Sequence, residues 1–459
     1  MLEKIRFDFS FVFSPNISDG LTEDEINSYS EKITRIIDEI EADAPGFLEV
    51  PFDKRNIDSV KELAAKYRYF KDYDDFVVLG IGGSALGNIA LRDSLNGLDW
   101  NRLSRDGRKG FPRIHVVDNV DPDFVSSILK NLDMKKTIFN VISKSGSTAE
   151  AMANYMVVRG IIESLGLDVR KHLIITTDPE NGVLRKIASE ENIDSLEIPP
   201  RVGGRFSVLT PVGLLSAIAG GLNIDALIDG AKNAYSLLKE RNIWKNPAAL
   251  NALVHYLYYT RGKNISVMMS YSNRLYSLAD WYRQLWAESL GKKYDINGNE
   301  VNVGQTPVKA LGATDQHSQI QLYNEGPNDK IVTFLVVRKF DNTVKIPKIH
   351  EDIDSLAYLG GKSLNELLSS EQRATAYSLA QNNRPNLNVE FSEICEESIG
   401  EFIFTYELQT AIMGKLLNIN AFDQPGVEMG KKLTYSLMGR KGYSQFKEIL
   451  EKSIKKYIV

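Results

Sequence analysis

The feature that most constrains the fold is a pair of short segments, each of which passes from an aliphatic run into small and hydroxyl-bearing residues. The first runs from Asp75 to Gly87 (DFVVLGIGGSALG), and the second from Val141 to Glu150 (VISKSGSTAE). In both segments, helical spacing resumes after the small residues. A strand, a tight loop and a helix start together aim backbone N–H groups and the positive end of a helix dipole at an anion. Two such loops predict a site for one phosphate group and the small molecule attached to it.

Composition favours a cytoplasmic protein of two or three domains. The chain has 459 residues, of which 43% are hydrophobic and 25% charged, which is typical of globular proteins and too long for one core. The formal net charge of −5 predicts neither a nucleic-acid nor a membrane partner. Cys395 is the single cysteine and the five histidines lie far apart, so no metal site is predicted. The uncharged run 206–224 contains Thr210-Pro211, a helix-start signal, and is interpreted as a buried helix.

Strands and helices are expected to alternate in two parts of the chain. In the first part, strands are expected at 76–80, 113–118, 138–142 and 172–177, and helices at 84–96, 121–132 and 147–165. In the second part, between about 245 and 410, strands are expected at 264–270, 307–311 and 330–337, and a helix at 277–290. Repeated βα units form a parallel sheet with helices on both faces.

The glycine loop has three interpretations. Gly80-Ile-Gly-Gly-Ser-Ala85 formally fits the dinucleotide motif GxGxxA. That motif needs an acid at the end of the next strand, about 20 residues on, whereas the strand-ending acid here is Asp118, considerably later. A sugar-phosphate loop is therefore favoured over a dinucleotide fold, and a plain tight turn stays open.

The second loop has two interpretations. Ser147 and Glu150 match the SxxE capping box, which predicts a helix start at this point. Capping alone does not explain why Ser143, Ser145 and Thr148 crowd the same turn. A phosphate monoester presents three acceptor oxygens, and hydroxyls at a helix N-terminus are suited to bind them. A capped helix without a ligand is the alternative.

Four further residues stand in unusual surroundings, and each also has an ordinary interpretation. Arg205 follows two glycines, which let the backbone approach a ligand closely, but a lone arginine is usually a surface group. Glu288 lies in an aromatic-rich helix and has an alternative i,i+4 ion pair with Lys292. His317 and Lys431 have the alternatives of a loop histidine and a surface lysine.

Six segments in order, from about residue 76 to residue 432, resemble the glucose-6-phosphate isomerase (phosphoglucose isomerase) family. They are GIGGS at 80–84, SKSGST at 143–148, GGRFS at 203–207, Gln284 with ESLGK at 288–292, Gln316-His317, and FDQPGVEMGK at 422–431. The last is the most specific because eight of its residues are fixed in the family. Ser145 stands where many members have threonine, and Pro425 replaces the tryptophan of some members.

The resemblance implies two sugar-isomerase (SIS) type α/β domains, each a mostly parallel sheet flanked by helices. The expected limits are 1–70 for a mainly helical N-terminal segment, 71–225 and 226–410 for the two domains, and 411–459 for a helical C-terminal segment. The implied reaction is the reversible isomerisation of glucose 6-phosphate to fructose 6-phosphate through an enediolate, in glycolysis and gluconeogenesis, without a metal or organic cofactor. The implied assembly is a homodimer.

The resemblance also implies a role for each matching residue. Glu288 corresponds to the base that moves a proton between C1 and C2, and Arg205 to the cation beside the enediolate. His317, reaching from the partner subunit, and Lys431 correspond to groups that assist ring opening. The implied substrate contacts are Gly83, Ser84, Ser143, Lys144, Ser145, Thr148, Gln284 and Gln424. Two alternatives stay open: a sugar-phosphate-binding regulator without turnover, and an isomerase that also accepts mannose 6-phosphate.

Overall fold

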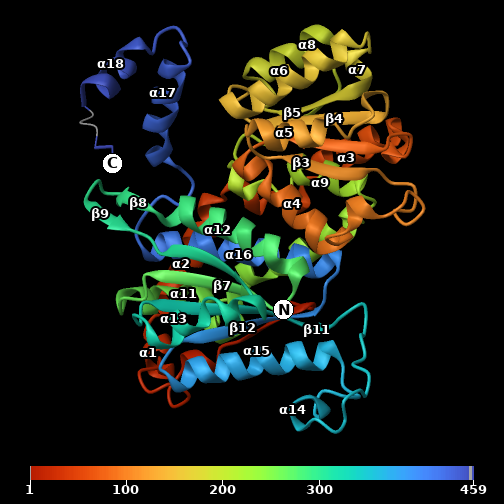
Figure 1. Ribbon diagram of the computed structural model, residues 1–459. Helices are drawn as coiled ribbons and strands as arrows, with labels where there is room; N and C mark the ends of the chain where they lie inside the picture. The colour runs from red at the N-terminus through yellow and green to blue at the C-terminus, as the bar shows by residue number, and fades with distance from the viewer. Residues whose placement is uncertain (1, 454–456, 459) are drawn as a thin grey trace.

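The computed structural model describes residues 2–453 and 457–458, and two five-stranded sheets with helices around them organise this part of the chain (Figure 1). The first sheet contains β2 (Asp75–Leu79), β3 (Arg113–Val117), β4 (Thr137–Ser143), β5 (Leu173–Thr177) and β6 (Ser195–Glu197), all parallel, in the order β3-β2-β4-β5-β6. The second contains β1 (Ile5–Asp8), β7 (Ile265–Ser270), β10 (Thr306–Leu311), β11 (Lys330–Lys339) and β12 (Asn386–Glu393), in the order β1-β12-β11-β7-β10. Of its pairings, only that of β1 with β12 is antiparallel. The expected α/β class with two mostly parallel sheets is confirmed.

Helices cover both faces of the first sheet, which is why its strands are continuous aliphatic runs. Every residue of β2, β4 and β5 is buried, as is usual in parallel sheets. One face packs on α5 (Pro122–Leu129), α6 (Ala149–Ser164) and α8 (Val183–Glu191). The other face packs on α3 (Lys54–Lys66), α4 (Leu86–Leu91) and α9 (Pro211–Ala219).

A long central helix, α16 (Glu396–Leu416), lies on one face of the second sheet, and almost all of its residues are buried. It packs on α2 (Ser30–Asp43), α10 (Ile224–Tyr235), α11 (Pro247–Thr260) and α12 (Tyr276–Leu290). The opposite face of the sheet packs on α13 (Ile320–Glu325) and α15 (Leu364–Gln381). Shorter elements are α1 (Glu23–Asn27), α7 (Val169–His172), α14 (Asp354–Ala357), and the hairpin of β8 (Lys292–Tyr294) with β9 (Glu300–Val303).

The C-terminal helices α17 (Glu428–Leu437) and α18 (Ser444–Ser453) stand away from both sheets, at the upper left of Figure 1. Only Ser436 is buried in α17. The Tyr435 hydroxyl donates to the carbonyl of Ser147 at 3.5 Å. This bond connects α17 and α18, which together form the C-terminal arm, to the loops of the first sheet. Apolar side chains, including Met429 and Leu437, are exposed on the arm.

Several expected elements are confirmed, and others are corrected. The helix expected at 84–96 is a short turn (Gly82–Ser84), then α4, then a π-helical turn (Arg92–Asn96). The sequence interpretation missed β6, β8, β9 and β12, and β1 of the N-terminal segment pairs with β12 in the second sheet. The domain limits themselves stay predictions. The uncharged run forms α9, which starts at Pro211 after the capping Thr210. Within the described residues, no helix is both long and apolar enough to cross a membrane.

Candidate active site

The glycine loop (80–85) and the serine loop (143–148) follow neighbouring strands at the point where the strand order of the first sheet reverses. β2 pairs with β3 on one side and with β4 on the other. In open parallel sheets, ligands bind in the crevice that such a reversal creates at the carboxyl ends of the strands. Residues 80–85 follow β2 and residues 143–148 follow β4, so both loops border this crevice. The half-buried Ser84 lies in the first of them.

Hydroxyl groups gather in the serine loop at the N-terminus of α6. The Ser143 Oγ donates to the Thr148 Oγ1 at 3.2 Å, and the Ser145 Oγ lies 3.4 Å from the same atom. The predicted capping box is wrong, because α6 begins at Ala149 and the Ser147 hydroxyl bonds the Ser145 hydroxyl at 3.3 Å instead of a backbone N–H. The hydroxyls and the helix N-terminus together form an arrangement suited to an anion.

Two glycines bring the glycine loop into direct contact with the loop that carries Arg205. A Cβ built on Gly83 would lie 2.2 Å from the carbonyl carbon of Gly204 and 2.7 Å from the backbone N of Arg205. Gly82 has a φ of +56°, and its Cβ would lie 2.9 Å from the Gln284 Nε2. The close approach to the loop that carries Arg205 therefore requires glycine at position 83, and the positive φ favours glycine at position 82, which lies beside Gln284 of α12.

Arg205 is 3% exposed and its guanidinium is held from several directions. Its Nε donates to the Ser289 Oγ at 2.7 Å, its Nη1 to the Gln424 Oε1 at 2.8 Å, and its Nη2 to the Ala421 carbonyl at 2.6 Å. The Nη1 also lies 3.5 Å from the Glu288 Oε2. Burial lowers the pKa of Arg205 and the nearby Glu288 opposes this, while a guanidinium stays charged in proteins. The site thus contains a fixed buried cation.

The Glu288 carboxylate lies in the last turn of α12 and is 35% exposed. One carboxylate oxygen accepts a hydrogen bond from the Gln284 Nε2 at 3.1 Å, and the other faces Arg205. The side chain is therefore both oriented by its neighbours and reachable by a ligand, as a general base must be.

Lys292 does not form the i,i+4 ion pair that was the alternative interpretation of Glu288. Its Nζ donates to the main-chain carbonyl of Glu288 at 2.7 Å and to that of Asp423 at 2.7 Å. The pairing differs because α12 ends at Leu290, with Gly291 as its extended C-cap, so Lys292 reaches the open end of the helix. Lys292 and the Ser289 partner of Arg205 were missed as site residues, although both lie in the ESLGK segment.

The Lys144 side chain connects the serine loop to the loop that carries Arg205, called the arginine loop. Its Nζ donates to the carbonyls of Pro200 and Val202 at 2.6 and 2.9 Å. Burial lowers the pKa of Lys144, and the nearby Asp178 opposes this shift. The segment before Arg205 is thereby held against the predicted phosphate loop.

Two predicted catalytic residues are not joined to this group within one chain. His317 is exposed in a short turn after β10, and in the described residues no hydrogen bond or ion pair links it to Glu288 or Arg205. Lys431 lies on the arm helix α17, is 47% exposed and pairs with Glu428 at 2.8 Å. The single chain therefore collects Gly83, Arg205, Gln284, Glu288 and Gln424 but not these two.

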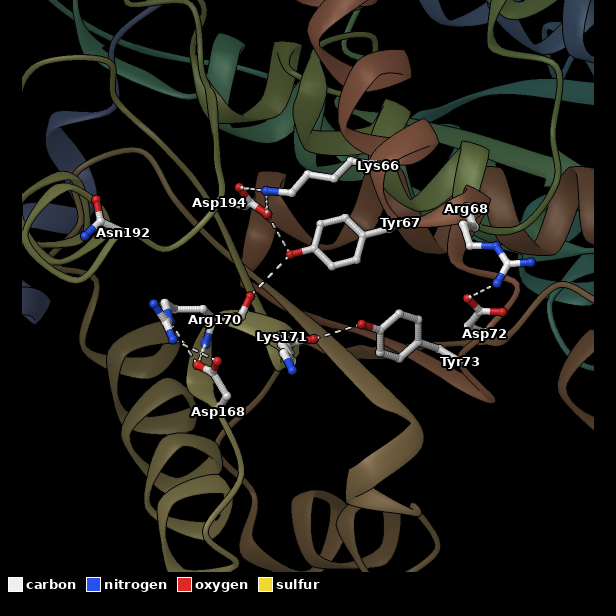
Figure 2. A pocket seen from close by; sticks show the side chains of 10 residues that line it. All are labelled: Lys66, Tyr67, Arg68, Asp72, Tyr73, Asp168, Arg170, Lys171, Asn192 and Asp194. Carbon is white, nitrogen blue, oxygen red and sulfur yellow. Dashed lines mark hydrogen bonds and ion pairs between the residues drawn. The ribbon is translucent and has the colours of Figure 1, made fainter.

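A separate cavity of about 540 Å³ lies at the opposite, amino-terminal edge of the first sheet (Figure 2). Its charged side chains pair with one another, as in Lys66 with Asp194 at 2.6 Å and Arg170 with Asp168 at 3.0 Å. The Tyr67 hydroxyl also donates to Asp194 at 2.7 Å. None of the predicted site residues lines this cavity.

Comparison with known proteins places the chain in a family. The phosphoglucose isomerase family model matches residues 54–456. The glucose-6-phosphate isomerase of Carboxydothermus hydrogenoformans is 46% identical over 448 residues, which are 96% of each chain. That of Rubrobacter xylanophilus is 41% identical over 442 residues, which cover 96% of this chain and 99% of the relative. The chain belongs to the phosphoglucose isomerase family.

Solved structures agree with the two-sheet fold. A hypothetical protein from Thermus thermophilus is 35% identical, with a TM-score of 0.83, and the match covers 95% of this chain and all of that chain. A glucose-6-phosphate isomerase from Chlamydia trachomatis is 20% identical with a TM-score of 0.81, covering 94% of this chain and 89% of the other. The second likeness bears on the fold alone.

Proposed function

We propose that this chain interconverts glucose 6-phosphate and fructose 6-phosphate, the activity for which its two named relatives are called isomerases. The observation that carries the proposal is the partly exposed Glu288 carboxylate beside the buried Arg205 guanidinium at 3.5 Å. The reaction needs a base and a cation that both reach the reacting carbons. The proposal includes a role in glycolysis and gluconeogenesis and a cytoplasmic setting, which the single cysteine, Cys395, supports.

Glu288 removes the proton from C2 of the open-chain aldose and returns it to C1, through an enediolate. The hydroxyl proton passes from O2 to O1, so that the C1 aldehyde becomes a hydroxymethyl group and C2 becomes the ketone. A positioned base typically contributes about 10² to 10⁴ in rate. The Arg205 guanidinium stabilises the negative charge that develops on the enediolate oxygens, which is worth about 3–4 kcal/mol if a lost oxyanion-hole donor is the guide. Gln284 orients the base through its 3.1 Å hydrogen bond.

The phosphate binds at the two loops, away from the reacting carbons. The proposed contacts to phosphate and sugar are Gly83, Ser84, Ser143, Ser145, Thr148, Gln284 and Gln424. Lys144 contributes by holding the arginine loop next to the serine loop. Binding energy from a remote phosphate orients C1 and C2 against the base, which raises the rate of the chemical step.

The proposed active unit is a homodimer in which His317 reaches the site of the partner subunit. His317 is exposed and lies outside the group around Arg205, and Lys431 lies on an arm whose apolar side chains are exposed. Both residues would assist opening of the sugar ring.

The direct test is turnover of glucose 6-phosphate by the purified chain in the presence of EDTA, with mannose 6-phosphate in parallel. Production of fructose 6-phosphate is the expected result. Saturable binding without turnover would contradict the proposal in favour of a sugar-phosphate-binding regulator. Comparable turnover of mannose 6-phosphate would broaden the substrate class.

Glu288→Gln is expected to lower kcat by at least about 10²-fold while leaving the Kd for the sugar phosphate nearly unchanged. The amide keeps the size of the side chain and its hydrogen bond with Gln284, but it cannot accept the proton. The measurement combines steady-state kinetics with calorimetric titration. A weakened Kd with kcat unchanged would show that Glu288 only binds the substrate.

A further inference from the structure

A buried lysine joins the end of the catalytic helix to the segment that carries Gln424. Lys292 is 7% exposed, and its Nζ lies 2.7 Å from the Glu288 carbonyl and 2.7 Å from the Asp423 carbonyl. The Asp423 carboxylate is a third partner at 3.4 Å. An ammonium group has three donors and no acceptor, so these three acceptors match its bonding capacity.

Two cations from distant parts of the chain converge on one main-chain oxygen. The Asp423 carbonyl accepts from Lys292 at 2.7 Å and from the Arg205 Nη2 at 3.2 Å. A carbonyl oxygen has two lone pairs, so both are used. The next residue, Gln424, accepts from the Arg205 Nη1 at 2.8 Å.

The segment that receives these bonds is exposed, and its other attachments are aromatic contacts of Phe422 and hydrogen bonds with Asn420. Phe422, Asp423 and Gln424 are all exposed. The Phe422 ring lies tilted against Phe206, with 5.4 Å between ring centroids, and stacks on Phe47 at 6.3 Å. The Phe422 backbone N–H donates to the Asn420 Oδ1 at 2.9 Å, and the Asn420 Nδ2 donates to the Asp423 carboxylate at 3.1 Å. These contacts hold Phe422 and the Asp423 side chain, while Lys292 and Arg205 supply the hydrogen bonds to the Asp423 carbonyl and to Gln424.

We propose that Lys292 is a positioning residue for the isomerisation: it holds the Asp423 carbonyl against the last turn of α12, so that Gln424 stays on Arg205 and Arg205 stays beside Glu288. This inference rests on the proposed function of Glu288 and Arg205. Burial and the nearby Arg205 lower the pKa of Lys292. The cation also lies at the C-terminal end of α12, where the helix dipole favours positive charge.

The test compares Lys292→Met with Lys293→Met. Methionine keeps the length of the lysine stem but removes the donors. Lys293 is the adjacent, exposed lysine, 3.6 Å from Glu300, and serves as the matched control. In Lys292→Met, kcat is expected to fall by about 10- to 100-fold, because small displacements of catalytic groups cost that much, and KM is expected to change less. Lys293→Met is expected to keep both constants.

Backbone hydrogen exchange gives a readout that does not depend on turnover. Peptides covering residues 418–424 are expected to exchange at least about tenfold faster in Lys292→Met than in Lys293→Met, as local opening becomes easier. Unchanged exchange and unchanged kcat would overturn the proposal. A raised KM with kcat unchanged would also overturn it, since Lys292 would then only support binding.

Two further outcomes, a variant that does not fold and an inactive wild type, are also decisive. If Lys292→Met does not fold, Lys292→Gln, which keeps a donor for one carbonyl, is measured in its place. Failure of both variants to fold would overturn the proposal in favour of a purely structural role. If the wild type itself does not isomerise glucose 6-phosphate, the proposed function fails, while the exchange comparison still decides whether Lys292 holds residues 421–424.

Discussion

At Gly83, the absence of a side chain decides how closely the glycine loop approaches Arg205. A Cβ there would lie 2.2 Å from the carbonyl carbon and 2.3 Å from the carbonyl oxygen of Gly204. Both obstacles are backbone atoms, which cannot move aside by changing a rotamer. Any larger residue at 83 must therefore displace the loop that carries the buried cation.

Gly83→Ala is expected to lower kcat/KM by at least about 10²-fold, because displacement of a catalytic group by about 1 Å costs that much. Gly160→Ala is the matched control, since its Cβ would meet no atom within 4 Å on the exposed side of α6. That control is expected to keep full activity and to gain about 0.5–1 kcal/mol of stability from helix propensity. The measurements are steady-state kinetics and urea unfolding. Full activity in Gly83→Ala would show that the two loops separate freely.

Helix α12 presents Glu288 on one face and buries the other, and the buried face depends on a neutral histidine. Trp286 is fully buried, and its ring contacts the His255 ring of α11 edge-on, with 5.5 Å between centroids. One ring nitrogen of His255 bonds the Asn251 carbonyl at 2.9 Å, and the other is buried without a hydrogen-bond partner among the described residues. Burial lowers the pKa of His255 to about 4. The packing behind Glu288 therefore requires the uncharged imidazole.

Acid is expected to destabilise this packing, and His255→Gln is expected to reduce the effect. The folded-state pKa of about 4 lies below the ordinary value of 6.5, so the unfolded chain binds more protons between these values. Stability is then lost as pH falls through that window. Between pH 7 and pH 5, the wild type is expected to lose about 2 kcal/mol more than His255→Gln. Urea unfolding at several pH values measures the difference.

A second buried group acts in the opposite direction and makes the comparison between variants necessary. Burial raises the pKa of Glu407 in α16 well above its usual value. Its contribution to stability is lost as pH rises above the unfolded-state value. Because Glu407 is present in both proteins, the difference between them isolates His255. Equal losses in the two proteins would show that His255 is protonated at no cost.

At the scale of the whole molecule, two of the predicted catalytic residues lie apart from the group around Glu288 and Arg205. His317 is exposed after β10, and Lys431 lies on the arm formed by α17 and α18 (Figure 1). Val427, Met429 and Leu437 are large apolar residues exposed around α17. Burial of such surface against a second copy is favourable and would complete the site.

Mixing two inactive variants is expected to restore activity if the site is shared. Glu288→Gln and His317→Ala are purified separately, then dissociated and reassembled together. In a mixed dimer, one site receives the intact Glu288 and the intact His317. Random exchange is expected to give about a quarter of the wild-type activity, since half of the dimers are mixed and one of their two sites is intact.

Each variant taken separately through the same dissociation and reassembly is the control and is expected to stay inactive. Light scattering on the mixture establishes the oligomeric state. No recovery of activity in a proven mixed dimer would contradict the shared site. A monomer of full wild-type activity would contradict the homodimer itself.

Local patterns predicted many of the strands and helices in both α/β parts of the chain. The strand expected at 76–80 is β2 at Asp75–Leu79, and the helix expected at 277–290 is α12 at Tyr276–Leu290. Hydrophobic runs and helix-start residues act over a few positions, so such elements can be predicted from neighbouring residues. The pairing of β1 with β12 could not be predicted in this way, because these strands come from opposite ends of the chain. The capping box failed because hydroxyl groups of the same turn bond each other.

By itself, the sequence determined the α/β class, the two small-residue loops and the residue types available for chemistry. Only the tertiary structure decided which of these groups meet. The Arg205 guanidinium reaches Gln424, 219 residues away, and Lys292 reaches the carbonyl of Asp423, 131 residues away. Such contacts depend on how whole helices and sheets pack, whereas the periodicity that predicts an element extends over only a few residues.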